Sequence, residues 1–144
     1  MTFKKMIEVR WSDIDAYQHV THTAYASFAT HTRVEWLVSV GCPISELINL
    51  NFAGVLVKEQ TEFLREVFLG ELVTVELYFA GSSENYAKWK FVSKIFNSKE
   101  KVAALHSVYG VWLDTTTRRV APPPGILLEK LKGLTRSEDF EILK

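Results

Sequence analysis

The stretch from Thr23 to Val40 constrains the fold most, because it contains no glycine and no proline. Gly41 and Pro43 follow directly. Glycine just past a helix end, with proline close behind, is typical of a helix stop. About 18 residues of α-helix would extend roughly 27 Å at 1.5 Å per residue. The sequence therefore predicts one helix long enough to cross a whole small domain.

The faces of this predicted helix differ in polarity. A broad apolar surface is formed by Tyr25, Phe28, Ala29, Trp36, Leu37 and Val40. A narrow polar stripe recurs every four residues, at Ser27, His31, Glu35 and Ser39. A wide apolar arc with a thin polar stripe is typical of a helix that is mostly enclosed by other parts of the protein.

Strands are predicted on both sides of the helix. Alternation of period two predicts strands at residues 3–11, 53–65, 73–79 and 86–96. Residues 102–113 are apolar on both faces, which is typical of a central strand or of one buried in a dimer. Strands joined by short loops after a single helix favour an antiparallel sheet around that helix, an α+β fold.

Composition bounds the remaining possibilities. The 144 residues show no linker and predict a single domain over residues 1–144, with residues 135–144 as a loose tail. A net charge of +0 gives no reason to expect nucleic acid or an acidic membrane surface as partner. The only cysteine, Cys42, fits a reducing compartment. Residues 1–11 contain no long apolar run, so we expect a cytoplasmic protein without a signal peptide or membrane span.

The acidic turn before the helix carries a motif. Residues 11–20 read WSDIDAYQHV, Tyr25 follows, and residues 33–37 read RVEWL. This pattern resembles the signature of hotdog-fold acyl-CoA thioesterases of the 4-hydroxybenzoyl-CoA thioesterase type, roughly aromatic-x-D-x-D-x-x-G-H-V-N-N-x-x-Y and then a helix with R-x-E. Residues 63–65 and 70–72 also stand where that family has its second and third strands. The resemblance implies a hotdog fold, with one long central helix wrapped by an antiparallel sheet.

The resemblance also implies an activity, the hydrolysis of an acyl-CoA thioester to a carboxylic acid and CoA without metal or cofactor. Asp15 matches the catalytic carboxylate, acting as nucleophile or general base. It lies just before the helix, where free amides and the helix dipole favour negative charge. By the same resemblance, the backbone N–H near His22 polarises the thioester carbonyl. The structural alternative is that Asp13 and Asp15 only organise the turn and cap the helix, the role that we expect for Asp13.

The side chains expected to bind substrate are Tyr17, His19, His22, Tyr25 and Glu59. His19 matches the family's histidine, and the tyrosines would fit the acyl group. Glu59 is an acid on an otherwise apolar strand face, so we expect it to face a neighbouring subunit's active site or to pair with an arginine such as Arg65. Each residue has a structural alternative: core packing for the tyrosines and a turn hydrogen bond for the histidines.

The sequence also departs from the family pattern. Gln18 stands where the family usually has glycine, and Thr21-His22 where Asn-Asn is common. Glycine permits backbone conformations that cost glutamine more. An acyl carrier protein as thioester donor and a non-catalytic acyl-thioester-binding hotdog protein therefore stay open as alternatives. One helix and one sheet also leave an apolar edge and face, so we expect a homo-oligomer, a dimer or a tetramer.

Overall fold

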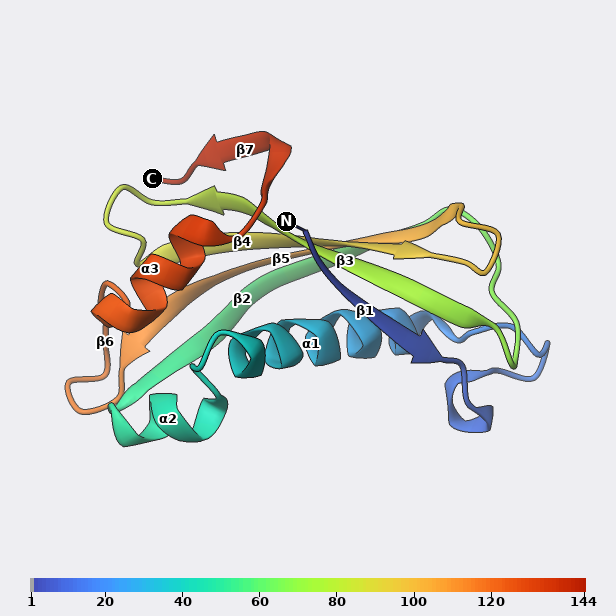
Figure 1. The fold of residues 1–144 in the computed structure, drawn as a ribbon, viewed down its shortest axis with the longest axis horizontal. Helices are drawn as coiled ribbons and strands as arrows, with labels where there is room; N and C mark the ends of the chain where they lie inside the picture. The colour runs from blue at the N-terminus through green and yellow to red at the C-terminus, as the bar shows by residue number, and fades with distance from the viewer. Residues whose placement is uncertain (1) are drawn as a thin grey trace.

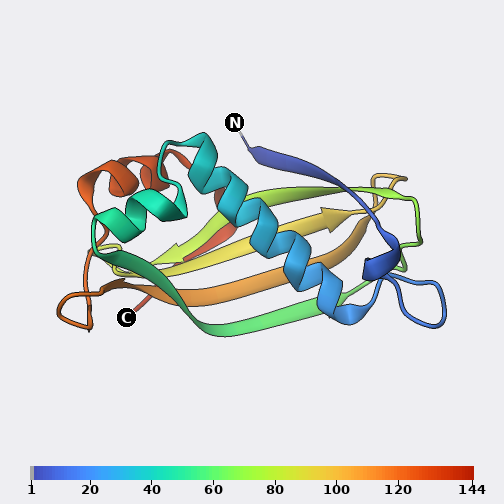
Figure 2. The ribbon, with the colours of Figure 1, turned by 90° about the horizontal axis from the view of Figure 1, so that it is seen from below.

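The computed structural model describes residues 2–144, in which one long helix lies across a curved sheet (Figures 1 and 2). The strands are β1 (Phe3–Glu8), β2 (Phe52–Phe63), β3 (Leu72–Ser82), β4 (Lys88–Phe96), β5 (Val102–Asp114), β6 (Arg119–Val120) and β7 (Arg136–Ile142). The helices are the 3₁₀ turn η1 (Trp11–Asp13), α1 (His22–Ser39), α2 (Ile44–Asn49) and α3 (Gly125–Gly133).

The sheet has the strand order β1-β3-β4-β5-β2, and each neighbouring pair in this series is antiparallel. β6 pairs with β5, and β7 pairs with β3 in the parallel direction. β5 is therefore a central strand, as one of the two sequence alternatives predicts; one of its faces is buried, and the other is half-buried in the single chain. The expected α+β architecture, a single long helix on an antiparallel sheet, is confirmed; the β3–β7 pair is the one parallel contact in the part of the chain described.

α1 begins one residue before the predicted start and ends one residue before the predicted end. Gly41 follows with a φ of +80°, a conformation that glycine adopts without the clash of a Cβ atom. The sheet covers only one side of the helix. On the other side Val34 and Val38 are 37% and 52% exposed, so in the single chain the helix is less enclosed than the polarity pattern predicts.

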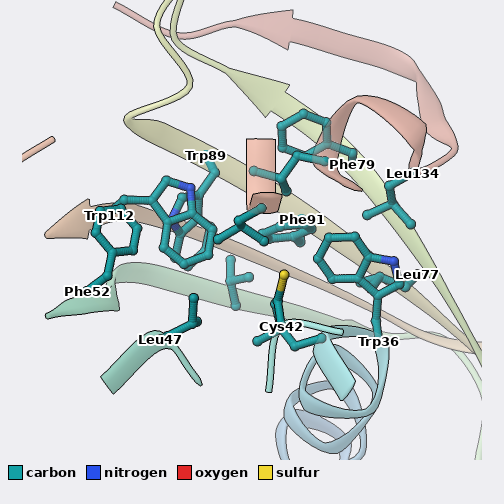
Figure 3. Packing of buried hydrophobic residues seen from close by; sticks show 14 residues of the cluster. Trp36, Cys42, Leu47, Phe52, Leu77, Phe79, Trp89, Phe91, Trp112 and Leu134 are labelled. Carbon is teal, nitrogen blue, oxygen red and sulfur yellow. The ribbon is translucent and has the colours of Figure 1, made fainter. Parts of the chain in front are cut away.

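Two groups of buried side chains fill the space between α1 and the sheet. The first, shown in Figure 3, includes Trp36, Leu47, Trp89, Phe91 and Trp112 and lies toward α2 and α3. The second lies near the start of α1 and contains Val9, Val20, Ala24, Tyr25, Phe28, Val67, Val73, Val75, Ile95, Ala103 and Ala104. Full burial of each large apolar side chain contributes about 1.5–3 kcal/mol, so these contacts, rather than local propensity, hold α1 on the sheet.

Two sequence predictions need correction. The first strand ends at Glu8, and Trp11 lies in η1 with 78% of its surface exposed. The predicted loose tail at residues 135–144 is wrong, since most of it forms β7. The ring of Phe140 on β7 packs against the ring of Phe79 on β3, with centroids 5.4 Å apart. The backbone N–H of Leu143 donates a hydrogen bond to Ser82 O at 2.9 Å. A largely polar segment is held here by backbone pairing and one aromatic anchor.

Candidate active site

The loop between β1 and α1 is organised by Asp13. This side chain is only 6% exposed, and its Oδ2 accepts a 2.9 Å hydrogen bond from the backbone N–H of Arg10. Its backbone oxygen accepts a further bond of 2.8 Å from the N–H of Thr21, at the start of α1. The first bond closes the turn after β1, and the second ties that turn to the start of α1, which agrees with the structural role expected for Asp13.

Asp15 lies on the exposed part of the same loop. Its Oδ1 accepts hydrogen bonds from the backbone N–H groups of Tyr17 at 2.9 Å and His19 at 3.4 Å. Its own N–H donates to His19 O at 2.9 Å. The two bonds to Oδ1 fix the orientation of the carboxylate on the loop. Oδ2 takes no part in them and is free to contact a substrate or a water molecule.

Gln18 adopts a φ of 66°, in the left-handed region. The family motif has glycine at this position, the residue for which that region carries no steric cost. Gln18 therefore holds a backbone conformation that glycine would adopt without steric cost.

An open cleft of about 390 Å³ lies beside Asp15. It is lined by Asp15, His19, Val20, His22, Tyr25, Phe63, Leu64, Arg65 and Glu66. The walls come from the acidic loop, the first turn of α1 and the end of β2. The structure thus brings together four of the residues singled out from the sequence: Asp15, His19, His22 and Tyr25.

The N-terminus of α1 opens near this cleft without an internal counter-charge. Thr21, at the N-cap position, makes no side-chain capping bond, and the first turn contains no acidic residue. The first amides of an α-helix lack intrahelical acceptors, and the helix dipole adds positive potential there. This helix end is suited to stabilising an anion that forms beside Asp15.

Tyr25 forms an inner wall of the cleft. It is 4% exposed, and its ring lies 5.5 Å from that of Phe63 in an edge-on contact. Burial, together with the negative charges of Glu71 and Glu66, raises the pKa of the Tyr25 phenol above its ordinary value of 10.0. Its hydroxyl therefore stays protonated at neutral pH and is able to donate a hydrogen bond.

Sequence reasoning missed Leu64, Arg65 and Glu66 as cleft residues. Arg65 is held by a 2.6 Å bond from its Nη1 to Val102 O, and Glu66 Oε1 lies 3.7 Å from Nδ1 of His19. They lie far from the acidic loop in the sequence. The only signal that the sequence offered was the weak family resemblance of residues 63–65.

Two predicted substrate-binding residues, Tyr17 and Glu59, do not line the cleft beside Asp15. Tyr17 is 81% exposed and is absent from the residues that line the cleft. Glu59 lies on β2, where its Oε1 is 3.7 Å from Nε2 of the buried His106. Arg65 binds the backbone of Val102, so the expected pairing of Glu59 with Arg65 is wrong. Whether Glu59 faces a neighbouring subunit stays a prediction.

Within residues 2–144, no three or more His, Cys, Asp or Glu side chains are grouped so that they would hold a metal ion. None of the helices in this same part of the chain is both long and apolar enough to cross a membrane.

Comparison with known proteins defines the class. The family model of the thioesterase-like superfamily matches residues 9–131, which is most of the chain, so the protein belongs to this superfamily. The match covers the acidic loop, α1, α2, the strands β2 to β6 and most of α3, and it leaves out β1 and β7. It confirms the resemblance identified in the sequence and, at the level of the family, the expectation of a thioester hydrolase.

Solved structures agree with the fold. One is the protein SAV2348 from Staphylococcus aureus in complex with CoA, with a TM-score of 0.85, 20% identity, and coverage of 96% of this chain and 91% of that chain. Another is Slr0204, a 1,4-dihydroxy-2-naphthoyl-CoA thioesterase from Synechocystis, with a TM-score of 0.84, 20% identity, and coverage of 93% and 98%. A Thermus thermophilus thioesterase complexed with coenzyme A and Zn has a TM-score of 0.74, 22% identity, and coverage of 90% and 91%. The hotdog fold is thereby confirmed.

Proposed function

We propose that this protein is an acyl-CoA thioesterase that uses Asp15 as its catalytic carboxylate. The observation that carries the proposal is the placement of Asp15, held by two backbone amides at the mouth of a cleft beside the uncapped N-terminus of α1. The structures of similar fold that contain CoA support CoA as the thiol half of the substrate.

The geometry supports a direct hydrolysis. Asp15 takes a proton from a water molecule, and the resulting hydroxide adds to the thioester carbon. The carbonyl oxygen becomes an oxyanion beside the first amides of α1, near His22, where the helix end stabilises it. The carbon–sulfur bond then breaks, and the thiolate of CoA receives the proton from Asp15. Direct attack by the Asp15 carboxylate, followed by hydrolysis of the anhydride, gives the same products.

The other cleft residues have roles consistent with this substrate. His19 and His22 are positioned to contact the polar part of the thioester, and Tyr25 with Phe63 provides an apolar wall for the acyl group. Arg65 adds a positive charge at the cleft, which suits the phosphates of CoA.

We also keep the homo-oligomer as part of the proposal, because β2 is an edge strand with Val55, Leu56 and Val57 exposed by 39%, 44% and 69%.

The test is thiol release from a panel of acyl-CoA and acyl carrier protein thioesters, with the parent and two matched variants. Asp15→Asn keeps the size of the side chain and its hydrogen-bond acceptor, so the fold should persist. Loss of the base should reduce hydrolysis by about 10²–10⁴-fold. Asp13→Asn should cost less activity and more stability, about 1 kcal/mol, because Asp13 organises the loop.

Each outcome of this experiment has a clear reading. Hydrolysis by Asp15→Asn at the parent rate would show that the proposed mechanism is wrong. Release of thiol only from acyl carrier protein substrates would show that the thioester donor is an acyl carrier protein and not CoA. A parent that binds acyl-CoA but releases no thiol from any substrate would be a binding protein rather than an enzyme.

A further inference from the structure

A second cavity lies under the C-terminal half of α1 and opens on the side of the molecule where β2 forms the sheet edge. It has a volume of about 150 Å³. The rings that form most of its walls lie between α1 and the sheet (Figure 3): Trp36, Trp89, Phe91 and Trp112. Val34 of α1 and Leu56 of β2 line its mouth, and both are exposed in the single chain. The mouth therefore faces the second copy that we expect at this edge.

Two glycines set the size of this cavity. A Cβ atom on Gly110 would overlap the ring of Trp89, and one on Gly54 would lie 2.9 Å from the ring of Trp112. Only glycine at these positions lets both indoles pack directly on the backbone of the sheet. A cavity of about 150 Å³ accommodates a benzene ring. The enclosed space therefore fits one ring or a short chain.

β2 lines this cavity at one end and the Asp15 cleft at the other. Leu56 lines the cavity, and Phe63 lines the cleft. Val57 interrupts the regular pairing with β5, so the alternation of the strand shifts by one residue there. The positions that face α1 are therefore even-numbered before Val57 and odd-numbered after it: Phe52, Gly54 and Leu56, then Glu59, Thr61 and Phe63. One face of a single strand thus belongs to both spaces.

A two-fold dimer at this edge brings the cleft of one copy to the cavity of the other. Two copies of one edge strand related by a two-fold axis run antiparallel. In the register that uses the whole of β2, the axis passes beside Val57, and each position that faces α1 before Val57 meets one after it. Phe63 then lies opposite the partner's Phe52, and Thr61 opposite the partner's Gly54. Paired strands lie roughly 4.7–4.9 Å apart, so the Phe63 wall of the cleft adjoins the partner's cavity.

The Asp15 cleft is open, and its only aromatic wall is formed by Tyr25 and Phe63. An apolar acyl group is bound more tightly where it is removed from water on all sides. We propose that the acyl group of a substrate held at Asp15 of one copy passes this wall and is bound in the aromatic cavity of the other copy. This role of the cavity rests on the proposed function and defines its substrate class, CoA thioesters whose acyl group is a single ring or a short chain.

Acyl size and blocked variants test the cavity. The parent's kcat/KM for benzoyl-CoA and hexanoyl-CoA should exceed that for 2-naphthoyl-CoA by at least about 10-fold, because two fused rings do not fit. Val34→Trp places an indole at the mouth and should lower kcat/KM for benzoyl-CoA by about 10- to 100-fold, while acetyl-CoA, too small to need the cavity, is hydrolysed as before. Ile44→Trp, also at the cavity, is a second blocked variant. Val38→Trp, on the same exposed side of α1 but outside the cavity, is the matched control and should act as the parent does.

Mixed dimers test whether the cavity acts in the other copy. Asp15→Asn and Val34→Trp chains that carry different affinity tags are combined, and dimers with one chain of each kind are purified through both tags. In such a dimer, the intact Asp15 of the Val34→Trp copy lies beside the open cavity of the Asp15→Asn copy, whereas the other site carries both defects. One site in two is intact, so benzoyl-CoA hydrolysis should recover to about half of the parent rate, although both homodimers hydrolyse it poorly.

The outcomes separate the role of the cavity from the proposed function. Hydrolysis by the Asp15→Asn homodimer at the parent rate would overturn the proposed function, and the role of the cavity with it. With Asp15→Asn inactive, four results would overturn the role of the cavity alone. They are a parent that stays monomeric, equal rates with benzoyl-CoA and 2-naphthoyl-CoA, blocked variants that hydrolyse benzoyl-CoA at the parent rate, and a mixed dimer without recovered activity.

Discussion

Gln18 illustrates how a single residue shapes the candidate active site. With a φ of 66°, it holds the turn between Asp15 and His19 in a conformation that suits glycine. A left-handed conformation costs an L-residue roughly 1–2 kcal/mol. The loop retains this strain where it presents Asp15, and strained backbone is often found at functional sites.

Replacing Gln18 by glycine should therefore stabilise the protein by about 0.5–1 kcal/mol, since relief of strain exceeds the extra entropy of glycine in the unfolded chain. We also expect the relative rates of hydrolysis across acyl-CoA substrates to change, because the substitution removes the glutamine side chain from the loop that carries Asp15. Urea unfolding and thiol-release assays measure the two effects. Identical rate ratios in both proteins would show that Gln18 does not tune substrate choice.

At the scale of elements, β2, β4 and β5 meet around a buried histidine. His106 on β5 is 1% exposed, and its Nδ1 lies 2.7 Å from Oγ1 of Thr61 on β2. Burial, together with the charge of Arg33, lowers the pKa of His106 below its ordinary value of 6.5, while Glu59 acts in the opposite direction. The sheet therefore packs around the neutral imidazole.

This predicts acid sensitivity. Because the pKa of His106 is lower in the folded chain, the unfolded chain binds more protons once the pH falls below about 6.5. The stability that depends on neutral His106 is fully present above that pH and is lost as the pH falls toward the lowered value. Unfolding free energies at pH 7.5 and 5.5 should differ less for His106→Gln than for the parent. An equal pH dependence in both proteins would contradict the assignment to His106.

β7 gives a second test at this scale, because one aromatic residue anchors it. Phe140 packs on Phe79 and also lies under the guanidinium of Arg136, 4.2 Å from its ring centroid. Phe140→Ala should cost about 2 kcal/mol of unfolding free energy, below the range for a fully buried phenylalanine. Ile142→Ala is the control, since Ile142 is 74% exposed and its loss should cost less than about 0.5 kcal/mol. Equal effects of the two changes would mean that β7 is not anchored through Phe140.

At the scale of the whole molecule, one side of the fold is left open. β2 forms a sheet edge, and Val57, in the irregular pairing between Leu56 and Lys58, is 69% exposed. The outer side of α1 adds Val34 and Val38. Unpaired edges and exposed apolar surface favour association with another chain.

Light scattering at micromolar concentration should therefore report a mass of at least twice the 16.5 kDa of one chain. Val57→Lys should lower the mass or raise the concentration needed for association, because a charge at the edge opposes pairing. Ile142→Lys, a similar change on an exposed strand outside this edge, is the control. A parent mass of 16.5 kDa would contradict the homo-oligomer.

Much of this molecule follows from its sequence, because the decisive signals are local. The absence of breakers from Thr23 to Val40 and the stop at Gly41 predict α1 within one residue at each end. Period-two alternation predicts the main strands, and the motif at residues 11–20 places Asp15 before the helix. Hydrogen bonds within helices and turns join near neighbours in sequence, so composition and spacing over short windows determine them.

The remaining features were decided only by the tertiary structure. β7 forms because a partner strand, β3, offers its backbone and Phe79 offers a ring, and neither is visible in the polar sequence of residues 136–142. The cleft gains Arg65 and Glu66 because the end of β2 lies beside the start of α1. Such contacts depend on strand order and on how α1 crosses the sheet, which are set by packing between residues distant in sequence.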